Sequence, residues 1–481
     1  MRAHAYASRS DRRGTGSIAI SAQLFIALAY VALLFGGTAL AHAHRHRLRQ
    51  SRWRIHAYTL ALGVYCTSWT YFGAVGTAAT GGWSFLPIYL GPILLMIAGG
   101  PFLRRLNAEV QEDGATSISD FIGSRFGKSR TIAALVTLIL VFGTIPYIAL
   151  QLRSVALSFA LVSGVAQPTA PLIGAAAILA LFAIAFGARR YQVAGQNEAI
   201  LFAVAFESLF KLIALLLVAA LAIWLLWTAP TDRIAAGMAT FRSGFAPARL
   251  DVNFAVTTLL SVLTIICLPR HFFISVTESR TPDDILTARW GFVIYLLVTV
   301  LAVLPIAAAG VAFLGQGATP DLFVLSLPQD FGYRGLGLFV FLGGLSAALA
   351  MVVTEIVAIS SMISNDLFAP VLLRRSAEDS HMGERLLWIR RSAIVGLIGA
   401  AVLYAMATPS TTQLASVGLI AFVAIAQCAP ALICAVYRPH NDPLAGKAGL
   451  VTGFALWFVI LFLPAIGSPA ITPPTWGGIS A

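Results

Sequence analysis

Residues 63–76 read Gly63-Val-Tyr-Cys-Thr-Ser-Trp-Thr-Tyr-Phe-Gly-Ala-Val-Gly76, with glycine and hydroxyl residues in the middle of an apolar segment. A later apolar segment reads Ser261-Val-Leu-Thr-Ile-Ile-Cys-Leu-Pro269-Arg270, with a proline inside it. Glycine and proline interrupt helices, and an interruption inside a membrane frees backbone groups that lipid cannot satisfy. The two stretches therefore predict a pair of broken membrane helices.

The composition places nearly the whole chain in the membrane. Asp, Glu, Lys and Arg make up 11% of the residues and hydrophobic residues 58%. A membrane core needs about 20 apolar residues in helix to cross it. Runs of that kind predict about twelve transmembrane helices and an all-α polytopic membrane protein with no sizeable soluble domain. The expected spans are residues 17–40, 56–78, 84–103, 131–155, 171–187, 197–226, 252–275, 290–314, 336–362, 391–408, 411–436 and 446–465.

The two interrupted helices stand five helices apart, an odd offset that reverses the membrane orientation of the second unit. Interrupted segments at matching positions of two halves indicate an inverted-repeat transporter. We expect repeats at 56–226 and 252–436, preceded by an extra helix at 17–40 and followed by one at 446–465. The remaining ends would be an external tail at 1–16 and a truncated C-terminal tail at 466–481. A kink that only improves packing remains the alternative for either break.

The basic residues predict the orientation. Of 32 Lys and Arg residues, 21 fall in loops after the odd-numbered expected helices, so those loops are expected to be cytoplasmic and the N-terminus outside. A net charge of +12 distributed in this way indicates topology rather than nucleic-acid binding. Ala39-Leu40-Ala41 resembles a signal-peptide cleavage site, but the preceding apolar run is longer than usual for one.

Cysteine and histidine do not form a metal site in the sequence pattern. The four cysteines all fall inside expected helices, as packing residues would. His42, His44 and His46 alternate with other residues, arginine among them, and favour contact with anionic lipid headgroups. No nucleophile–base constellation is recognisable either, so we expect neither an enzyme nor a cofactor.

Charged residues also lie inside the expected helices. Glu207 and Lys211 lie near the middle of the span 197–226, four residues apart, so they can pair on one face and take part in proton movement. A purely structural ion pair is the other interpretation. Glu355 and Asp366 lie nearer the helix ends and are expected to extend toward the membrane surface. Arg270 is the exception, because the carbonyls freed before Pro269 lie within reach of a cation.

Several motifs together resemble the sodium/solute symporter family, and most closely the transporter-type input domain of CbrA-like sensor histidine kinases. They cover nearly the whole chain in the same order. The motifs are Tyr65–Gly76, Ser84–Pro92, Thr116–Ile122, Ile145-Pro-Tyr-Ile-Ala-Leu-Gln-Leu152, Phe206-Glu-Ser208 and Phe341–Ala347.

The resemblance implies a LeuT-like core of two five-helix inverted repeats. It places the substrate at Thr67, Ser68 and Trp69, facing Ser261 and Ile265. It places the ion site at backbone carbonyls near Gly63 and Cys66 and at three positions of the span 336–362, which are Ala347, Ala350 and Met351. Sodium-dependent relatives carry hydroxyl groups where this chain has Ala350 and Met351. Because Na⁺ needs oxygen ligands, sodium coupling is expected to be weak or absent, with H⁺ as the other candidate.

Two functions follow as expectations. The first is secondary transport of a small polar organic solute, an amino acid such as histidine by the resemblance, across a bacterial inner membrane. The alternative is a solute-sensing input domain for two-component signalling, whose kinase would link to a response regulator. The resemblance implies a kinase module beyond the last helix, and none lies within residues 1–481, so this chain is expected to be truncated relative to such kinases.

Overall fold

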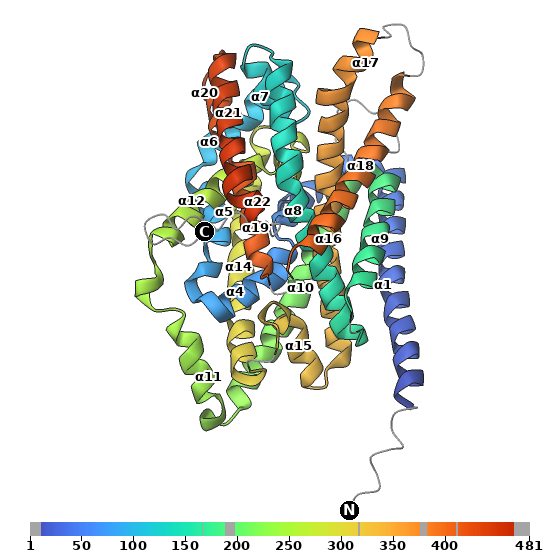
Figure 1. Cartoon of the computed structure of the whole chain (residues 1–481), viewed down its shortest axis with the longest axis vertical. Helices are drawn as coiled ribbons and strands as arrows, with labels where there is room; N and C mark the ends of the chain where they lie inside the picture. Colours follow the sequence, from blue (N-terminus) through green and yellow to red (C-terminus); the bar gives the residue numbers. More distant parts are fainter. Residues whose placement is uncertain are drawn as a thin grey trace, which may run out of the picture.

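The computed structural model describes residues 11–165, 167–187, 198–315, 318–375, 382–409 and 412–465. These residues are almost entirely helical and form an elongated bundle (Figure 1). Most of the N-terminal and C-terminal tails, and Arg189 and Arg190, lie outside the described residues.

The helices of the first half follow the expected spans closely. They are α1 (Asp11–Ala43), α2 (Arg45–Gln50), α3 (Arg54–Ala61), α4 (Ala74–Gly81), α5 (Pro87–Ala98), α6 (Gly100–Asp113), α7 (Ile118–Arg125), α8 (Arg130–Ser163), α9 (Thr169–Gly187), α10 (Glu198–Thr228) and α11 (Thr231–Ser243). The motif Thr116–Ile122 falls at the start of α7, and the side chain of Ser117 caps this helix by accepting from the Asp120 amide.

The second half begins with α12 (Val252–Cys267), α13 (Pro269–Phe272), α14 (Asp284–Phe313), α15 (Phe323–Asp330), α16 (Arg334–Met362) and α17 (Ala369–Arg375). It ends with α18 (Met382–Ala407), α19 (Leu414–Ala426), α20 (Ala429–Tyr437), α21 (Pro443–Trp457) and α22 (Leu463–Ala465). Among the described residues, eight helices are long and apolar enough to cross a membrane, or ten spans when two bent pairs are included. The expected count of about twelve is higher because α9 is shorter than the other spans, and because parts of the expected spans 56–78 and 84–103 are counted together as one bent pair.

Both predicted breaks are present. In the first, α3 continues into a 3₁₀ turn (Leu62–Tyr65), the chain becomes extended at Cys66, and a wide π-helical turn (Trp69–Gly73) leads into α4. In the second, α12 ends at Cys267, Leu268 is extended, and α13 runs into another π-helical turn (Phe273–Thr277). The two halves of the second helix meet at an angle of 55°.

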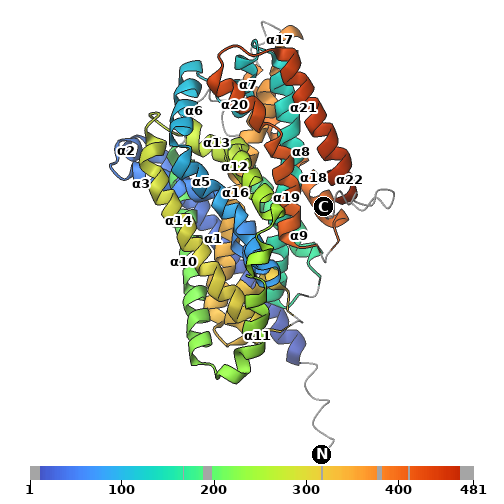
Figure 2. The same ribbon diagram turned by 90° about the vertical axis from the view of Figure 1, so that its left-hand side faces the viewer.

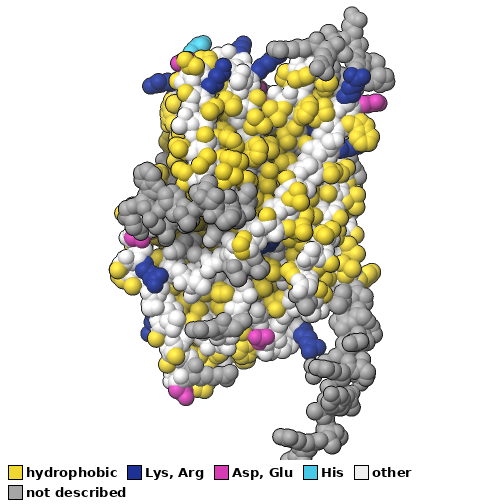
Figure 3. All heavy atoms as spheres, viewed as in Figure 1, with side chains coloured by type: hydrophobic (Ala, Val, Ile, Leu, Met, Phe, Trp, Pro, Cys, Tyr) yellow, Lys and Arg dark blue, Asp and Glu magenta, His cyan; other side chains and the backbone are white. Residues whose placement is uncertain are grey.

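The longest helices surround the breaks. α10 packs against α16, α14 and α3, and α8 packs against α19, α18 and α16 (Figure 2). α1 lies along the outside of α10, with most of its apolar surface left exposed. Figure 3 shows hydrophobic side chains across one face of the bundle, with Lys and Arg mostly toward its two ends. This distribution is that of a multi-pass membrane protein.

Connecting helices close the two ends. α6, α7, α17 and α20 gather at the upper end of Figure 1, and α11 and α15 at the lower end. The connections before α12 and before α16 are themselves partly helical. They contain α11 and α15, and most of α15 is buried because its apolar side chains pack under the bundle.

Candidate functional site

The first break presents two backbone carbonyls to a lysine. The Nζ atom of Lys211, on α10, donates to the carbonyl of Gly63 at 2.8 Å and also to the carbonyl of Cys66. Both carbonyls belong to the 3₁₀ turn and the extended residue that follows α3, where helical hydrogen bonding stops. The Gly63 carbonyl also accepts from the Cys66 amide at 3.0 Å, so the buried ammonium is a second donor to that oxygen and a donor to the Cys66 carbonyl.

The three predicted ion-site positions of α16 are buried, and the hydroxyl groups next to them in the sequence bond elsewhere. Ala347, Ala350 and Met351 are buried on α16. The hydroxyl of Thr354 donates back to the carbonyl of Ala350 at 2.6 Å, and that of Ser346 donates to the carbonyl of Glu207 at 3.4 Å. Neither hydroxyl is directed at the carbonyls that Lys211 holds.

Glu207 and Lys211 lie on the same helix, but they do not form the expected contact. Within the described part of the chain, no carboxylate lies within ion-pair distance of Lys211, whose hydrogen bonds go to the first break. Glu207 is buried one turn away. The carbonyl oxygens outcompete the carboxylate as partners because the break brings two of them to the same point.

The three residues predicted to meet the substrate lie inside the bundle. The hydroxyl of Thr67 is 3.2 Å from that of Tyr147, and the Ser68 amide donates to Oε1 of Gln151 at 3.0 Å. Trp69 packs edge-on against Phe422, with ring centroids 4.7 Å apart, and a side chain at Gly418 would overlap its indole ring. The first break is therefore lined by α8 and α19.

Ser261 and Ile265 were expected to face this break from the seventh helix. The hydroxyl of Ser261 instead donates to the carbonyl of Thr257 at 2.9 Å, and its Cβ lies so close to Gly91 that no side chain would fit there. Ser261 therefore packs against α5. Ile265 is fully buried, and the structure gives it no polar contact with Thr67, Ser68 or Trp69.

Sequence reasoning missed the charged pair at the second break. Arg270 and Glu355 are both fully buried, and Nη1 of Arg270 is 3.0 Å from Oε2 of Glu355. The hydroxyl of Thr144 donates to the other oxygen of Glu355 at 3.0 Å. The expectation that Glu355 extends to the membrane surface is wrong, because Arg270 neutralises it inside the bundle. The Asp366 carboxylate is likewise held inside, by hydroxyls of Ser119 and Thr137.

The guanidinium of Arg270 also lies over the ring of Tyr147, 4.5 Å from its centroid. Tyr147 thus links the second break to Thr67 of the first. Tyr147 and Gln151 are spaced i, i+4 within the motif 145–152, and two polar residues on one face of an otherwise apolar run were the available signal.

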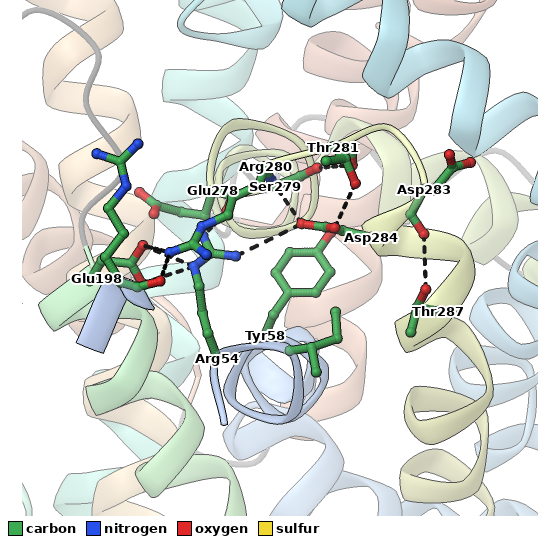
Figure 4. A network of polar contacts seen from close by, with 12 residues as sticks. Arg54, Tyr58, Glu198, Glu278, Ser279, Arg280, Thr281, Asp283, Asp284 and Thr287 are labelled. Carbon is green, nitrogen blue, oxygen red and sulfur yellow. Dashed lines mark hydrogen bonds and ion pairs between the residues drawn. The ribbon is translucent and has the colours of Figure 1, made fainter. Parts of the chain in front are cut away.

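A polar network closes one side of the first break (Figure 4). Nε of Arg54, on α3, is 2.9 Å from Glu198 on α10, and its Nη2 donates to the carbonyl of Glu278 at 2.7 Å. The hydroxyl of Tyr58 donates to the carbonyl of Ser275 at 2.6 Å. Arg54, which the sequence indicated as a surface charge, is buried and ties both broken helices together.

A second closure lies at the opposite end. Oδ2 of Asp321, in the 3₁₀ turn before α15, accepts from the Leu414 amide at the start of α19 at 3.1 Å. Its other oxygen lies so close to Gly76 of α4 that any side chain at position 76 would overlap it. The turn therefore packs directly on the outer half of the first broken helix.

Between these closures, a small pocket adjoins Lys211. It is lined by Cys66, Thr67, Thr70, Tyr71, Lys211, Leu212, Leu215, Tyr295 and Thr299, and its space is about that of one water molecule.

Comparison with known proteins supports a transporter fold. No family model matches the chain. It is 25% identical over 403 residues to the uncharacterized symporter YodF of Bacillus subtilis (strain 168), covering 82% of this chain and 77% of that protein. Its structure resembles that of a Na⁺-coupled sialic acid symporter in a substrate-bound outward-open state, with a TM-score of 0.60, 12% identity, and coverage of 92% and 98% of the two chains.

A manganese transporter of Eremococcus coleocola is also similar, with a TM-score of 0.51 and 14% identity over 88% of this chain and 90% of that one. At these sequence identities, the similarity to the solved structures is evidence for the fold alone. The fold is that of the LeuT-like transporters, an all-helical membrane bundle with interrupted helices, as the sequence predicts.

Proposed function

We propose that this protein is a secondary active transporter of a small polar organic solute, with amino acids as the first candidates, in a bacterial inner membrane. It would work by alternating access, with Lys211 in place of a bound sodium ion and with protons as the coupling ion. The observation that carries the proposal is the contact of the Lys211 ammonium with the carbonyls of Gly63 and Cys66.

The chemistry of that contact supports a built-in cation. Carbonyl oxygens at a broken helix are the ligands a hard cation uses, and an ammonium group fills the same position with its N–H donors. Ala350 and Met351 offer no hydroxyl to complete a sodium shell, and the Thr354 hydroxyl bonds within its own helix. A sodium ion would have to displace the Lys211 ammonium, which is covalently attached to α10.

Proton coupling follows from the same group. Loss of the Lys211 proton would remove the charge and one donor, which would weaken the tie between α10 and the first break. Glu207, one turn away, is a second group that can hold a proton. Thr67, Ser68 and Trp69 would contact the solute where α8 and α19 approach the break. The repeat boundaries 56–226 and 252–436 remain part of this proposal.

The alternative of a sensor input domain rests on no particular contact among the described residues. The curated relative is named a symporter, and the similar solved structures are transporters by name. We therefore place transport first.

Uptake into proteoliposomes tests the proposal. Labelled amino acids would be offered under an inward proton gradient, under an inward sodium gradient, and under neither. We expect accumulation with the proton gradient and none that depends on sodium. Lys211→Ala should reduce proton-driven uptake at least tenfold, because a contribution of about 1.4 kcal/mol from the ammonium already corresponds to that factor.

Lys447→Ala, which removes a partly exposed lysine of α21, is the matched control and should transport normally. Uptake that requires sodium, or uptake unaffected in Lys211→Ala, would overturn the assignment of Lys211. Failure to accumulate any amino acid under either gradient would count against the transport proposal itself.

A further inference from the structure

Only some of the N–H donors of the Arg270 guanidinium form hydrogen bonds. Its Nη1 and the backbone amide of Arg270 both face Oε2 of Glu355, at 3.0 and 3.3 Å. Nε and Nη2 have no hydrogen-bond partner among the described residues, although the side chain is fully buried. Buried N–H donors without a partner are rare in folded proteins, so this pair calls for an acceptor.

The two free donors are the ones that recognise a carboxylate best. Nε–H and Nη2–H point the same way along one edge of the planar guanidinium, and together they bind both oxygens of a carboxylate. Glu355 does not take this edge. The Glu355 carboxylate approaches the guanidinium from the other side. It neutralises the charge without occupying the edge formed by Nε–H and Nη2–H.

Other unsatisfied polar atoms lie around the same aromatic ring. Tyr147 lies under the guanidinium and meets Thr67, and Gln151 lies one turn further along α8. The Oγ atom of Ser68 and Nε2 of Gln151 are both fully buried and without a partner within the described segments. Three elements, the two breaks and α8, therefore leave polar atoms unpaired in one region of the bundle.

We propose that Arg270 binds the carboxylate of the transported solute through Nε and Nη2, so that the substrates are small monocarboxylates. Ser68 and Gln151 would hold a polar group at the other end of the same molecule. The solute enters when one of the two closures opens and leaves through the other. This inference rests on the proposed function, whose site it uses.

An equilibrium binding experiment tests the inference without requiring transport. The purified full chain, in sodium-free detergent buffer, would be heated with millimolar acetate, glycine, L-alanine, L-proline or L-histidine. Each carboxylate would be paired with its amide at equal ionic strength. We expect at least one carboxylate to raise the melting temperature while its amide does not, because only the carboxylate engages both donors.

Two variants locate the effect. Arg270→Lys keeps the charge beside Glu355 but lacks the fork, and should weaken the affinity for that carboxylate about ten- to a hundredfold. The double variant Arg270→Gln with Glu355→Gln removes both buried charges together, which avoids leaving either one unpaired. It should also lose binding while remaining monodisperse. Arg153→Lys, at the outer end of α8, is the control and should bind normally.

Three results would overturn the inference: equal stabilisation by a carboxylate and its amide, unchanged affinity in Arg270→Lys, or no stabilisation by any of the five carboxylates. A protein that binds a carboxylate through Arg270 but does not move it across a membrane would leave this inference intact and contradict the proposed function instead.

Discussion

Single residues near the two breaks form hydrogen bonds or ion pairs with the polar groups there. Lys211 fills the first break from a neighbouring helix, so its charge is fixed in place by two carbonyls. Arg270 belongs to the second break itself and is neutralised by Glu355 of α16. The first arrangement satisfies two carbonyls with a tethered charge, and the second leaves two N–H donors without a partner among the described residues.

Asp321 gives the clearest dependence on pH at the residue scale. Burial raises its pKa to about 6, although the hydrogen bond from the Leu414 amide and the charge of Arg153 lower it. Because the folded protein then holds this proton more tightly than the unfolded chain, its stability should fall as the pH rises from about 4 to about 6.

Asp321→Asn keeps an acceptor for the Leu414 amide but cannot titrate. The variant should lose this part of the pH dependence and gain on the order of 2 kcal/mol of stability above pH 6 relative to the parent. Thermal unfolding of the two proteins across this pH range checks the prediction. Asp330→Asn, an exposed acid of the same loop, should behave like the parent. A stability difference that does not vary with pH would show that Asp321 does not titrate there.

At the scale of elements, the half-helix α3 is the part best placed to move. It is eight residues long, it is followed by the first break, and the buried Arg54 holds it to α10 and to the chain after the second break. Removing one partner from a buried ion pair costs about 3–5 kcal/mol. Loss of Arg54 should therefore release this closure before it disturbs the rest of the bundle.

Cys66 reports on that release. It is buried at the first break, so a maleimide reaches it only when the closure opens. In a background without Cys267, Cys428 and Cys434, Arg54→Gln should raise the rate of Cys66 labelling at least tenfold. Arg104→Gln, which removes an exposed pair with Asp283, should leave the rate unchanged. Equal labelling rates in both variants would mean that Arg54 does not close this side.

The elements also show what the sequence could and could not supply. Pro269 and the glycines of 63–76 indicate breaks because their effect on a helix is local. The Arg270–Glu355 pair joins residues of two different helices, and no periodicity within either helix reveals which polar groups will meet. The same holds for Tyr147, Gln151 and Phe422, which reach the first break from helices that follow it in the chain. The resemblance predicted Ser261 at this break, but a resemblance of motifs carries no information on the close approach of α12 to Gly91.

At the scale of the whole molecule, the distribution of charged residues matches the elongated shape of the bundle. The ends of the bundle carry most of the exposed Lys and Arg, and the wall between them is apolar (Figure 3). The arginine-rich loops near α6 and α7 gather at one end, and α11 and α15 lie at the other (Figure 1). The excess of basic residues at the first end predicts that this end faces the cytoplasm.

Reporter fusions test this orientation. Alkaline phosphatase, which is active only outside the cytoplasm, should be active when fused after Gly244 and inactive when fused after Lys128. A fluorescent protein that matures only inside should give the opposite pattern at the same two positions. Phosphatase activity after Lys128 would reverse the predicted topology.

The contacts of Arg54 and Asp321 lie on opposite sides of the first break, and both are formed in this conformation; in the proposed transport cycle they would be the two gates. Many copies of the resting protein can therefore be present in a membrane without dissipating the membrane potential. That voltage stays available as a power source only as long as the two ends never open together.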